Sequence, residues 1–269
     1  MARIFFALLA AGAVWMLPAA AADEFAASPA NEANPMTVVL DARQAPRGLM
    51  YVRMTIPARP GPFTLVYPKW IPGEHGPTGP LRVLSQLRVS AGGHALAWQR
   101  DQVDLYAFHL TVPSGVSQID VEFTGIINAP EDVMATKNVA IVNWNRYILY
   151  QADTHNTDVF AKPSVILPAG WKYGTALPDP RQNGDRVDFG TVSLETLVDS
   201  PLDMGRYSKR IDQWSNGSAS AQIDIFADKP QDLNIDAKVV KEYKNYAAEG
   251  IALYGARHWN YYHALLTLS

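Results

Sequence analysis

The sequence contains no cysteine, so the protein can form neither a disulfide nor a thiolate site, and its stability has to come from its core. Charge is also sparse, because only 18% of the residues are charged and the formal net charge is −3. This balance predicts no surface for nucleic acid or for anionic membranes. Hydrophobic residues make up 48% of the chain, which indicates a globular protein and not a disordered one.

Familiar catalytic signatures are missing as well. There is no His-Glu-x-x-His, which would place two zinc ligands on one helix face, and no Gly-x-Ser-x-Gly elbow, phosphate loop or dinucleotide fingerprint. His258 and His263 flank the start of a predicted strand, so they are not expected to converge on a metal. The sequence therefore predicts no catalytic residue, no metal ligand and no cofactor in this chain. Its six histidines are His75, His94, His109, His155, His258 and His263.

The N-terminus has the pattern of a targeting segment. Arg3 precedes an apolar run over residues 4–17, and small residues follow as far as Ala22. This predicts a signal peptide over residues 1–22, with cleavage after Ala22. An uncleaved anchor is the alternative, although the run is shorter than the roughly 20 residues that a membrane span needs. We therefore expect an exported protein, periplasmic or secreted, with no membrane segment after cleavage.

Residues 23–35 are rich in Ala, Asn and Pro and predict a flexible leader, after which residues 36–215 predict a β-rich domain. In this domain apolar and polar residues alternate repeatedly with period two, between frequent turns. No convincing amphipathic helix occurs there. The predicted fold class is mainly β, with an antiparallel β-sandwich or curved sheet. Strands are expected near residues 37–42, 50–56, 63–67, 83–89, 95–98, 106–112, 119–124, 139–142, 147–150, 165–168, 187–189 and 205–207.

Residues 216–269 predict the truncated start of a second, mixed α/β domain. Residues 221–226 and 262–268 read as strands, and the apolar face from Val240 to Tyr254 has helical spacing. Asp232 or Asn234 is the expected N-cap of this helix, and Gly255 its C-terminal stop. A strand–helix–strand unit is a poor independent core. The alternative is that this tail packs back on the β-rich domain as a finished structure.

One loop, residues 67–81, has four prolines and three glycines in fifteen residues. That density excludes both a helix and a central strand, and predicts an ordered, turn-rich loop with Trp70 and Ile71 packed into the core. Glu74 and His75 could form an acid–base pair, although two groups without a third to orient them are more typical of a surface loop.

Two further features could bind ligands. Asp153 to Asp158 carries ligand-type side chains, but its pattern favours an Asx-turn loop over a metal site. Seven tryptophans and twelve tyrosines could line a sugar cleft, but scattered aromatics in a β protein are usually core residues. Neither feature identifies a site.

Several short stretches, taken in order, resemble the glycyl aminopeptidase family of zinc metallopeptidases. They are Trp70-Ile71-Pro72-Gly73, residues 197–205 (Leu-Val-Asp-Ser-Pro-Leu-Asp-Met-Gly), residues 254–259 (Tyr-Gly-Ala-Arg-His-Trp) and residues 263–269 (His-Ala-Leu-Leu-Thr-Leu-Ser). Members of this gluzincin family have a β-rich N-terminal domain, a thermolysin-like catalytic domain and often a C-terminal PDZ module. The chain departs from many members at Glu74-His75-Gly76-Pro77, which follows the first motif.

The resemblance implies that zinc and the peptide substrate belong to a catalytic domain downstream of residue 269, with two His and a Glu as ligands. No position here matches those ligands. Asp199-Ser200-Pro201 matches a family motif that is expected to form a turn at the domain junction. The predicted function is the N-terminal, non-catalytic portion of an exported aminopeptidase-like metallopeptidase, inactive alone. The alternatives are a complete secreted β-sandwich module that binds peptide or glycan, and a hydrolase that uses Glu74 and His75.

Overall fold

In a computed structural model the described residues are 30–71, 73–127, 135–257 and 259–268. The predicted signal peptide, most of the leader and most of the loop over residues 128–138 lie outside them. The fold is mainly β, as predicted, with four sheets and few helices. Among the described residues, no helix has both the length and the apolar character needed to cross a membrane.

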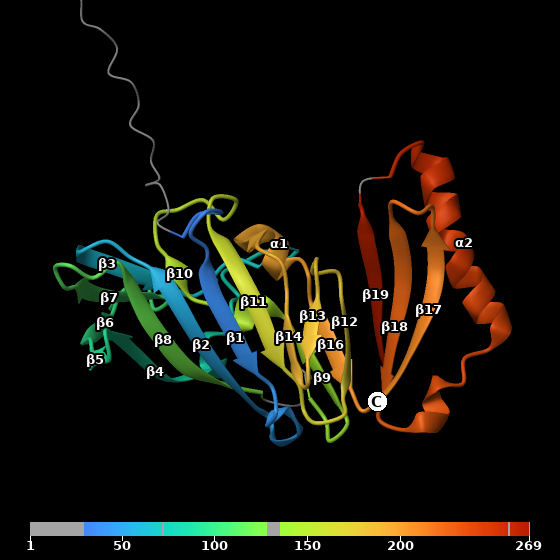
Figure 1. Cartoon of the computed structure of the whole chain (residues 1–269), viewed down its shortest axis with the longest axis horizontal. Coiled ribbons are helices and arrows are strands. Elements are labelled where there is room, and N and C mark those ends of the chain that lie inside the picture. The colour runs from blue at the N-terminus through green and yellow to red at the C-terminus, as the bar shows by residue number, and fades with distance from the viewer. Residues whose placement is uncertain (1–29, 72, 128–134, 258, 269) are drawn as a thin grey trace, which may run out of the picture.

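The largest sheet has nine strands in the order β13-β14-β11-β1-β2-β8-β4-β5, with β15 paired to β11. Only the β1–β11 pair is parallel within it. Figure 1 shows it as the broad curved sheet of the β-rich domain. Its strands are β1 (Met36–Asp41), β2 (Leu49–Pro57), β4 (Leu84–Ala91), β5 (His94–Ala95), β8 (Gln118–Ile126), β11 (Phe160–Ile166), β13 (Arg181–Asn183), β14 (Arg186–Asp188) and β15 (Val192–Ser193).

Two smaller sheets share the core of this large sheet. One has the order β10 (Tyr150–Gln151), β3 (Gly61–Val66), β7 (Ala107–Val112), β6 (Trp98–Arg100), and the other the order β12 (Lys172–Thr175), β16 (Leu202–Gly205), β9 (Val139–Val142). Period-two alternation explains their common core. On β2, for example, Met50, Val52 and Met54 are buried while Tyr51 and Arg53 are exposed.

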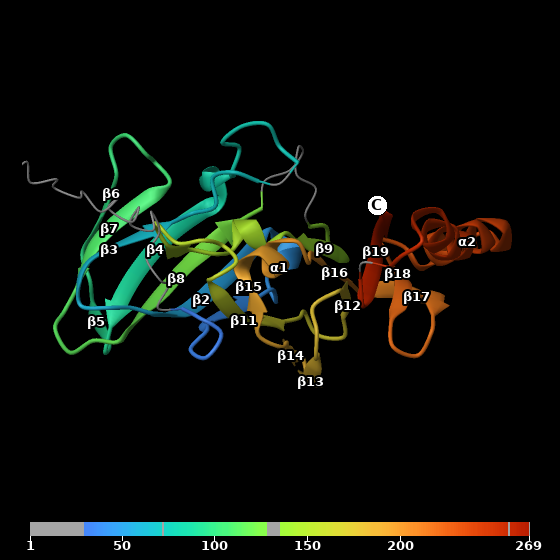
Figure 2. The same ribbon diagram turned by 90° about the horizontal axis from the view of Figure 1, so that it is seen from above.

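A fourth, three-stranded sheet lies at one end of the molecule, with the order β17 (Tyr207–Ser215), β18 (Ser220–Ala227), β19 (Tyr261–Leu268). Helix α2 (Ala237–Tyr254) connects β18 to β19, which pair in parallel, and lies along the side of this sheet that faces away from the β-rich domain (Figures 1 and 2). The predicted strand–helix–strand order is confirmed. The predicted stop at Gly255 is confirmed too, because its N–H donates to the Ile251 carbonyl at 2.9 Å.

The expected boundary near residue 216 requires a correction. β17, assigned from sequence to the β-rich domain of residues 36–215, pairs along its length with β18 and has no partner strand in the β-rich domain among the described residues. The turn at Asn216-Gly217 is therefore the tip of a hairpin inside the second unit. A turn-rich stretch marks the end of a strand, and that end can lie within a sheet as well as between two domains.

The helices differ from expectation in two places. α1 (Leu194–Val198), which the sequence did not predict, begins at Ser193, whose Oγ accepts from the Thr196 N–H at 3.1 Å. Its five residues are too few to show a helical period. α2 begins after Asp236, because that carboxylate accepts from the Lys238 N–H, and neither Asp232 nor Asn234 is its N-cap. The remaining short helices are η1 (Ala45–Arg47), η2 (Leu81–Val83), η3 (Trp144–Arg146) and η4 (Pro230–Leu233).

The strand expected over residues 147–150 is mostly absent. η3 ends at Arg146, residues 147–149 follow it without regular structure, and only Tyr150 of the expected strand enters β10. Ile148 and Leu149 are nevertheless fully buried. A short apolar run predicts burial, but it does not distinguish a strand from irregular core backbone.

Candidate functional sites at the loop and the domain junction

The Pro/Gly loop, residues 67–81, is turn-rich as predicted, and its described residues lack regular structure up to Pro80, but polar contacts hold it in place. Trp70 is 66% exposed, so the expectation that it packs into the core is wrong. Instead, the Tyr106 hydroxyl contacts the Pro77 and Gly79 carbonyl oxygens at 2.9 Å each, and the Gly79 N–H donates to Lys69 O at 3.0 Å. At Gly79 a Cβ would lie 1.9 Å from a backbone oxygen, so only glycine permits this closure.

A cavity of about 410 Å³ lies where this loop meets the segment that follows α1. Glu74 from the loop and Asp199 and Pro201 from the second motif line it together, so the fold brings these two distant motifs to one place. His75 does not line this cavity, and no hydrogen bond joins it to Glu74 within the described residues. The other lining residues are Ile71, Thr78, Pro80, Arg82, Asn143, Asn145, Arg146 and Val198.

The remaining sequence candidates do not form a metal site in the structure. Asp153 to Asp158 is a turn-rich loop, in which Thr154 donates to Gln151 O at 2.8 Å and the Asp158 N–H donates to His155 O at 3.0 Å. On β7, His109 pairs with Asp101 at 2.8 Å. Nowhere in the described part of the chain do three His, Asp or Glu side chains gather closely enough to hold a metal ion. The zinc of the family therefore has no fitting ligand set among these residues.

The junction between the β-rich domain and the terminal sheet contains two buried carboxylates, each 3% exposed. Asp203 on β16 accepts a hydrogen bond from the Thr267 hydroxyl of β19 at 2.9 Å. Asp224 on β18 contacts His263 Nδ1 and Arg210 Nε, both at 2.5 Å. The Asp203–Thr267 hydrogen bond connects the motif over residues 197–205 to the motif over residues 263–269.

The pKa values of the two carboxylates are shifted in opposite directions. Burial raises the pKa of Asp203 to about 6, with nearby Asp224 adding to the shift and the Thr267 hydrogen bond opposing it. Burial acts on Asp224 in the same sense, but the hydrogen bonds from His263 and Arg210 outweigh it, so the pKa of Asp224 lies below its usual value. Asp224 therefore stays ionised between two donors, whereas Asp203 is the member of the pair that accepts a proton near pH 6.

Sequence reasoning missed this junction, although one signal was present. Asp224 interrupts the apolar run Ile223-Asp224-Ile225-Phe226, and an acidic residue inside a fully buried strand requires a partner. Its partners are 14 and 39 residues away in the chain, so no local spacing could identify them. Asp203 likewise lies in a buried strand and depends on a residue 64 positions later.

The model of the Peptidase M61 N-terminal domain matches residues 37–206, which is more than half of the chain. The chain belongs to the M61 peptidase family. The resemblance to the N-terminal domain of a metallopeptidase is thereby confirmed. The M61 match ends at Arg206, immediately before β17 begins at Tyr207, so it agrees with the corrected start of the terminal unit.

A solved structure shares the fold of this M61 chain. An aminopeptidase N family protein from Idiomarina loihiensis superposes with a TM-score of 0.70 at 14% identity, over 87% of this chain and 39% of that one. This chain thus spans about two fifths of that protein. An M1 zinc metallopeptidase from Deinococcus radiodurans is a more distant match, with a TM-score of 0.44 at 13% identity, over 88% of this chain and 59% of that one. No curated protein matches.

Proposed function

We propose that this chain is the N-terminal, non-catalytic portion of an exported, aminopeptidase-like zinc metallopeptidase. The M61 match over residues 37–206 carries the proposal, because it covers the whole β-rich domain. The proposal assigns zinc and peptide hydrolysis to a further part of the full-length enzyme, and it is consistent with the lack of a three-residue metal-ligand group among the described residues. In this proposal the β-rich domain supports the terminal sheet through the Asp203–Thr267 hydrogen bond, and the zinc-bearing segment packs beyond that sheet.

Two measurements on the purified chain test this assignment. Elemental analysis is expected to find no bound zinc, and aminoacyl anilides are expected to remain uncleaved. Stoichiometric zinc, together with turnover that a chelator abolishes, would overturn the proposal. The reading frame after Ser269 gives an independent test, because the proposal requires a His-Glu-x-x-His sequence there.

Export is part of the same proposal and rests on the apolar N-terminal segment. N-terminal sequencing of the protein from a periplasmic or culture fraction is expected to begin at Asp23. A chain that keeps residues 1–22 and stays with the membrane fraction would instead support the uncleaved anchor.

A second candidate function is a module that binds a peptide. The 410 Å³ cavity between the Pro/Gly loop and Asp199 favours it, since acidic and amide side chains there could hold a peptide end. Saturable binding of short peptides that Asp199→Asn weakens and Asp212→Asn leaves unchanged would support this module. The same measurement decides against it if no peptide binds to the isolated chain.

A further inference from the structure

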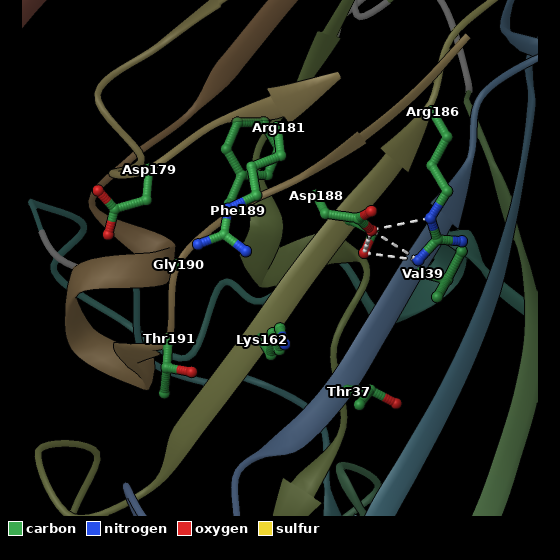
Figure 3. A pocket seen from close by; sticks show the side chains of 11 residues that line it. Thr37, Val39, Lys162, Asp179, Arg181, Arg186, Asp188, Phe189, Gly190 and Thr191 are labelled. Atoms are coloured by element: carbon green, nitrogen blue, oxygen red, sulfur yellow. Dashed lines mark hydrogen bonds and ion pairs between the residues drawn. The ribbon is translucent and has the colours of Figure 1, made fainter. Parts of the chain in front are cut away.

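The outer surface of the large sheet contains a cavity of about 530 Å³, formed over β1, β11, β14 and β13 (Figure 3). The pairing register of these strands determines which residues line the cavity. Arg181 pairs with Asp188, Asp188 with Ser164, and Ser164 with Val39, so one cross-strand row from four strands lies across the cavity. The cavity is lined by Thr37, Val39, Lys162, Ser164, Asp179, Arg181, Arg186, Asp188, Phe189, Gly190 and Thr191.

Within this row the charge of Asp188 is already neutralised. Its Oδ1 accepts from Arg186 Nε at 2.8 Å and from the Ser164 hydroxyl at 2.7 Å, and a second Arg186 nitrogen lies 2.9 Å from the same hydroxyl. The Arg186 hydrogen bond is the main reason that the pKa of Asp188 lies below its usual value. Arg186, Asp188 and Ser164 therefore form a closed set that needs no ligand.

Two cations of the cavity remain outside that set. Neither Arg181 nor Lys162 makes an ion pair or hydrogen bond through its side chain with another described residue, and both are exposed. Lys162 is nevertheless near enough to Asp188 to contribute to the lowering of that pKa. Figure 3 shows the guanidinium of Arg181 turned away from Asp188, on the side of Gly190 and Thr191. Lys162 projects from β11 on the same surface, two residues from Ser164.

The opposite wall is fixed by backbone hydrogen bonds. The Phe189 N–H donates to Pro163 O at 3.0 Å and the Gly190 N–H to Pro178 O at 2.9 Å. The Asp179 carboxylate lies 3.0 Å from the point where Gly190 would carry a Cβ, so the two residues approach each other closely. Asp179 itself has φ +52°, a left-handed conformation that a non-glycine residue seldom adopts. Backbone hydrogen bonds thus fix this wall of the cavity, which also carries the carboxylate of Asp179.

We propose that this cavity binds a small ligand through a carboxylate or phosphate group, held by Arg181 and Lys162. The two parallel N–H groups of the Arg181 guanidinium match the paired oxygens of a carboxylate or phosphate. The Lys162 ammonium adds electrostatic attraction that does not depend on a fixed geometry. The hydroxyls of Thr37 on β1 and of Thr191 after β14 also line the cavity and can donate to the remaining oxygens. The single acid outside the closed set, Asp179, restricts the anion to the side of the cavity that carries Lys162. This site is independent of the proposed metallopeptidase function.

The test titrates the chain with inorganic phosphate and, separately, with acetate, at constant ionic strength, by following amide chemical shifts. Residues 188–191 and 162–164 are expected to shift saturably with at least one anion. Arg181→Gln is expected to weaken binding about tenfold or more, since a charge-assisted hydrogen bond is lost, and Lys162→Gln is expected to weaken it less. Arg59→Gln is the matched control, because Arg59 is an exposed arginine outside the cavity.

The two anions distinguish the ligand class, because preference for phosphate or for acetate shows which group the site is built for. Equal loss of binding in Arg59→Gln and Arg181→Gln would show general charge attraction and overturn the site. The absence of saturable shifts with both anions would overturn it as well. A thermal melt of each variant confirms that it is folded, so lost binding reports on the cavity.

Discussion

The β-rich domain and the terminal unit are stabilised in different ways. One apolar cluster extends through all three sheets of the β-rich domain. The terminal unit, residues 207–268, has a cluster of only three buried residues, Ile211, Ile223 and Ile225, and α2 contains no buried residue. Asp224 joins its three strands through hydrogen bonds with Arg210 and His263, and Thr267 connects the unit to Asp203 of the β-rich domain. The β-rich domain is therefore stabilised mainly by its large buried apolar area, and the terminal unit mainly by buried charges that have hydrogen-bond partners. We expect the terminal unit to unfold first.

The largest effect should come from truncating a core isoleucine in each part. Ile119 on β8 and Ile225 on β18 are both fully buried, which makes the two substitutions matched. Ile119→Ala is expected to lower the free energy of unfolding of the β-rich domain by about 3–4 kcal/mol, because it leaves a cavity in a close-packed core. Ile225→Ala should instead open the terminal unit alone, giving a second, earlier transition in urea.

Hydrogen exchange measured strand by strand checks this pair. In Ile225→Ala, protection should fall on β18 and β19 and persist on β2 and β8. A single transition that moves all strands together in both variants would contradict the comparison and show one cooperative unit.

The next effect concerns the charged junction. Asp224→Ala removes the acceptor of both His263 and Arg210, so we expect a loss of about 2–3 kcal/mol in the stability of the terminal unit. Asp212→Ala on β17 is the control, since Asp212 is exposed and has one long contact, at 3.4 Å, with Gln222. Differential scanning calorimetry of the two variants measures the difference. Equal melting of Asp224→Ala and wild type would show that the junction is not stabilising.

A smaller effect, of opposite sign, is expected at Asp203. Its folded pKa of about 6 lies above the usual value of 3.8. The contribution of Asp203 to the free energy of unfolding is therefore most favourable below pH 3.8. It decreases as the pH rises toward 6 and stays lower above pH 6. Asp203→Asn removes the ionisation, so it should stabilise the protein at pH 7–8 by about 1–2 kcal/mol and flatten the decline between pH 4 and 6. Urea unfolding across this pH range tests it, and an unchanged slope in the variant would contradict it.

The smallest effect is expected on the outer side of α2. Leu253 is 77% exposed, so Leu253→Ala should change the free energy of unfolding by less than about 0.5 kcal/mol. A loss near that of Ile225→Ala, measured at the same protein concentration, would mean that this side of α2 is covered in solution.

The sequence predicted the strands well where one face is buried. The alternation on β2, β7 and β8 follows directly from the pleat, and α2 follows from its helical spacing. What could not be predicted depends on which strands become neighbours. The partners of Asp224, the meeting of Glu74 with Asp199, and the row that contains Arg181 and Ser164 all depend on pairing between distant segments.

The sequence predicted correctly which side of α2 is apolar, but not how much of that side is buried. Val240 and Tyr243 pack against the small isoleucine cluster, but Tyr254 at the end of the same face is 76% exposed. Helical spacing identifies which side of a helix is apolar, and the area of sheet available beneath it decides how much of that side is buried. For Trp70, similarly, an apolar residue between prolines indicates an ordered loop without indicating burial.

The parallel pairing of β1 with β11 has a consequence for how the protein folds. β1 lies inside the large sheet, between β2 and β11, and the register joins Met36 to Ala161. One side of this early strand has no partner until the chain reaches residue 166, so a long loop must close before the sheet can be completed. Such high contact order predicts slow folding, with an edge of β1 open to wrong partners until β11 arrives.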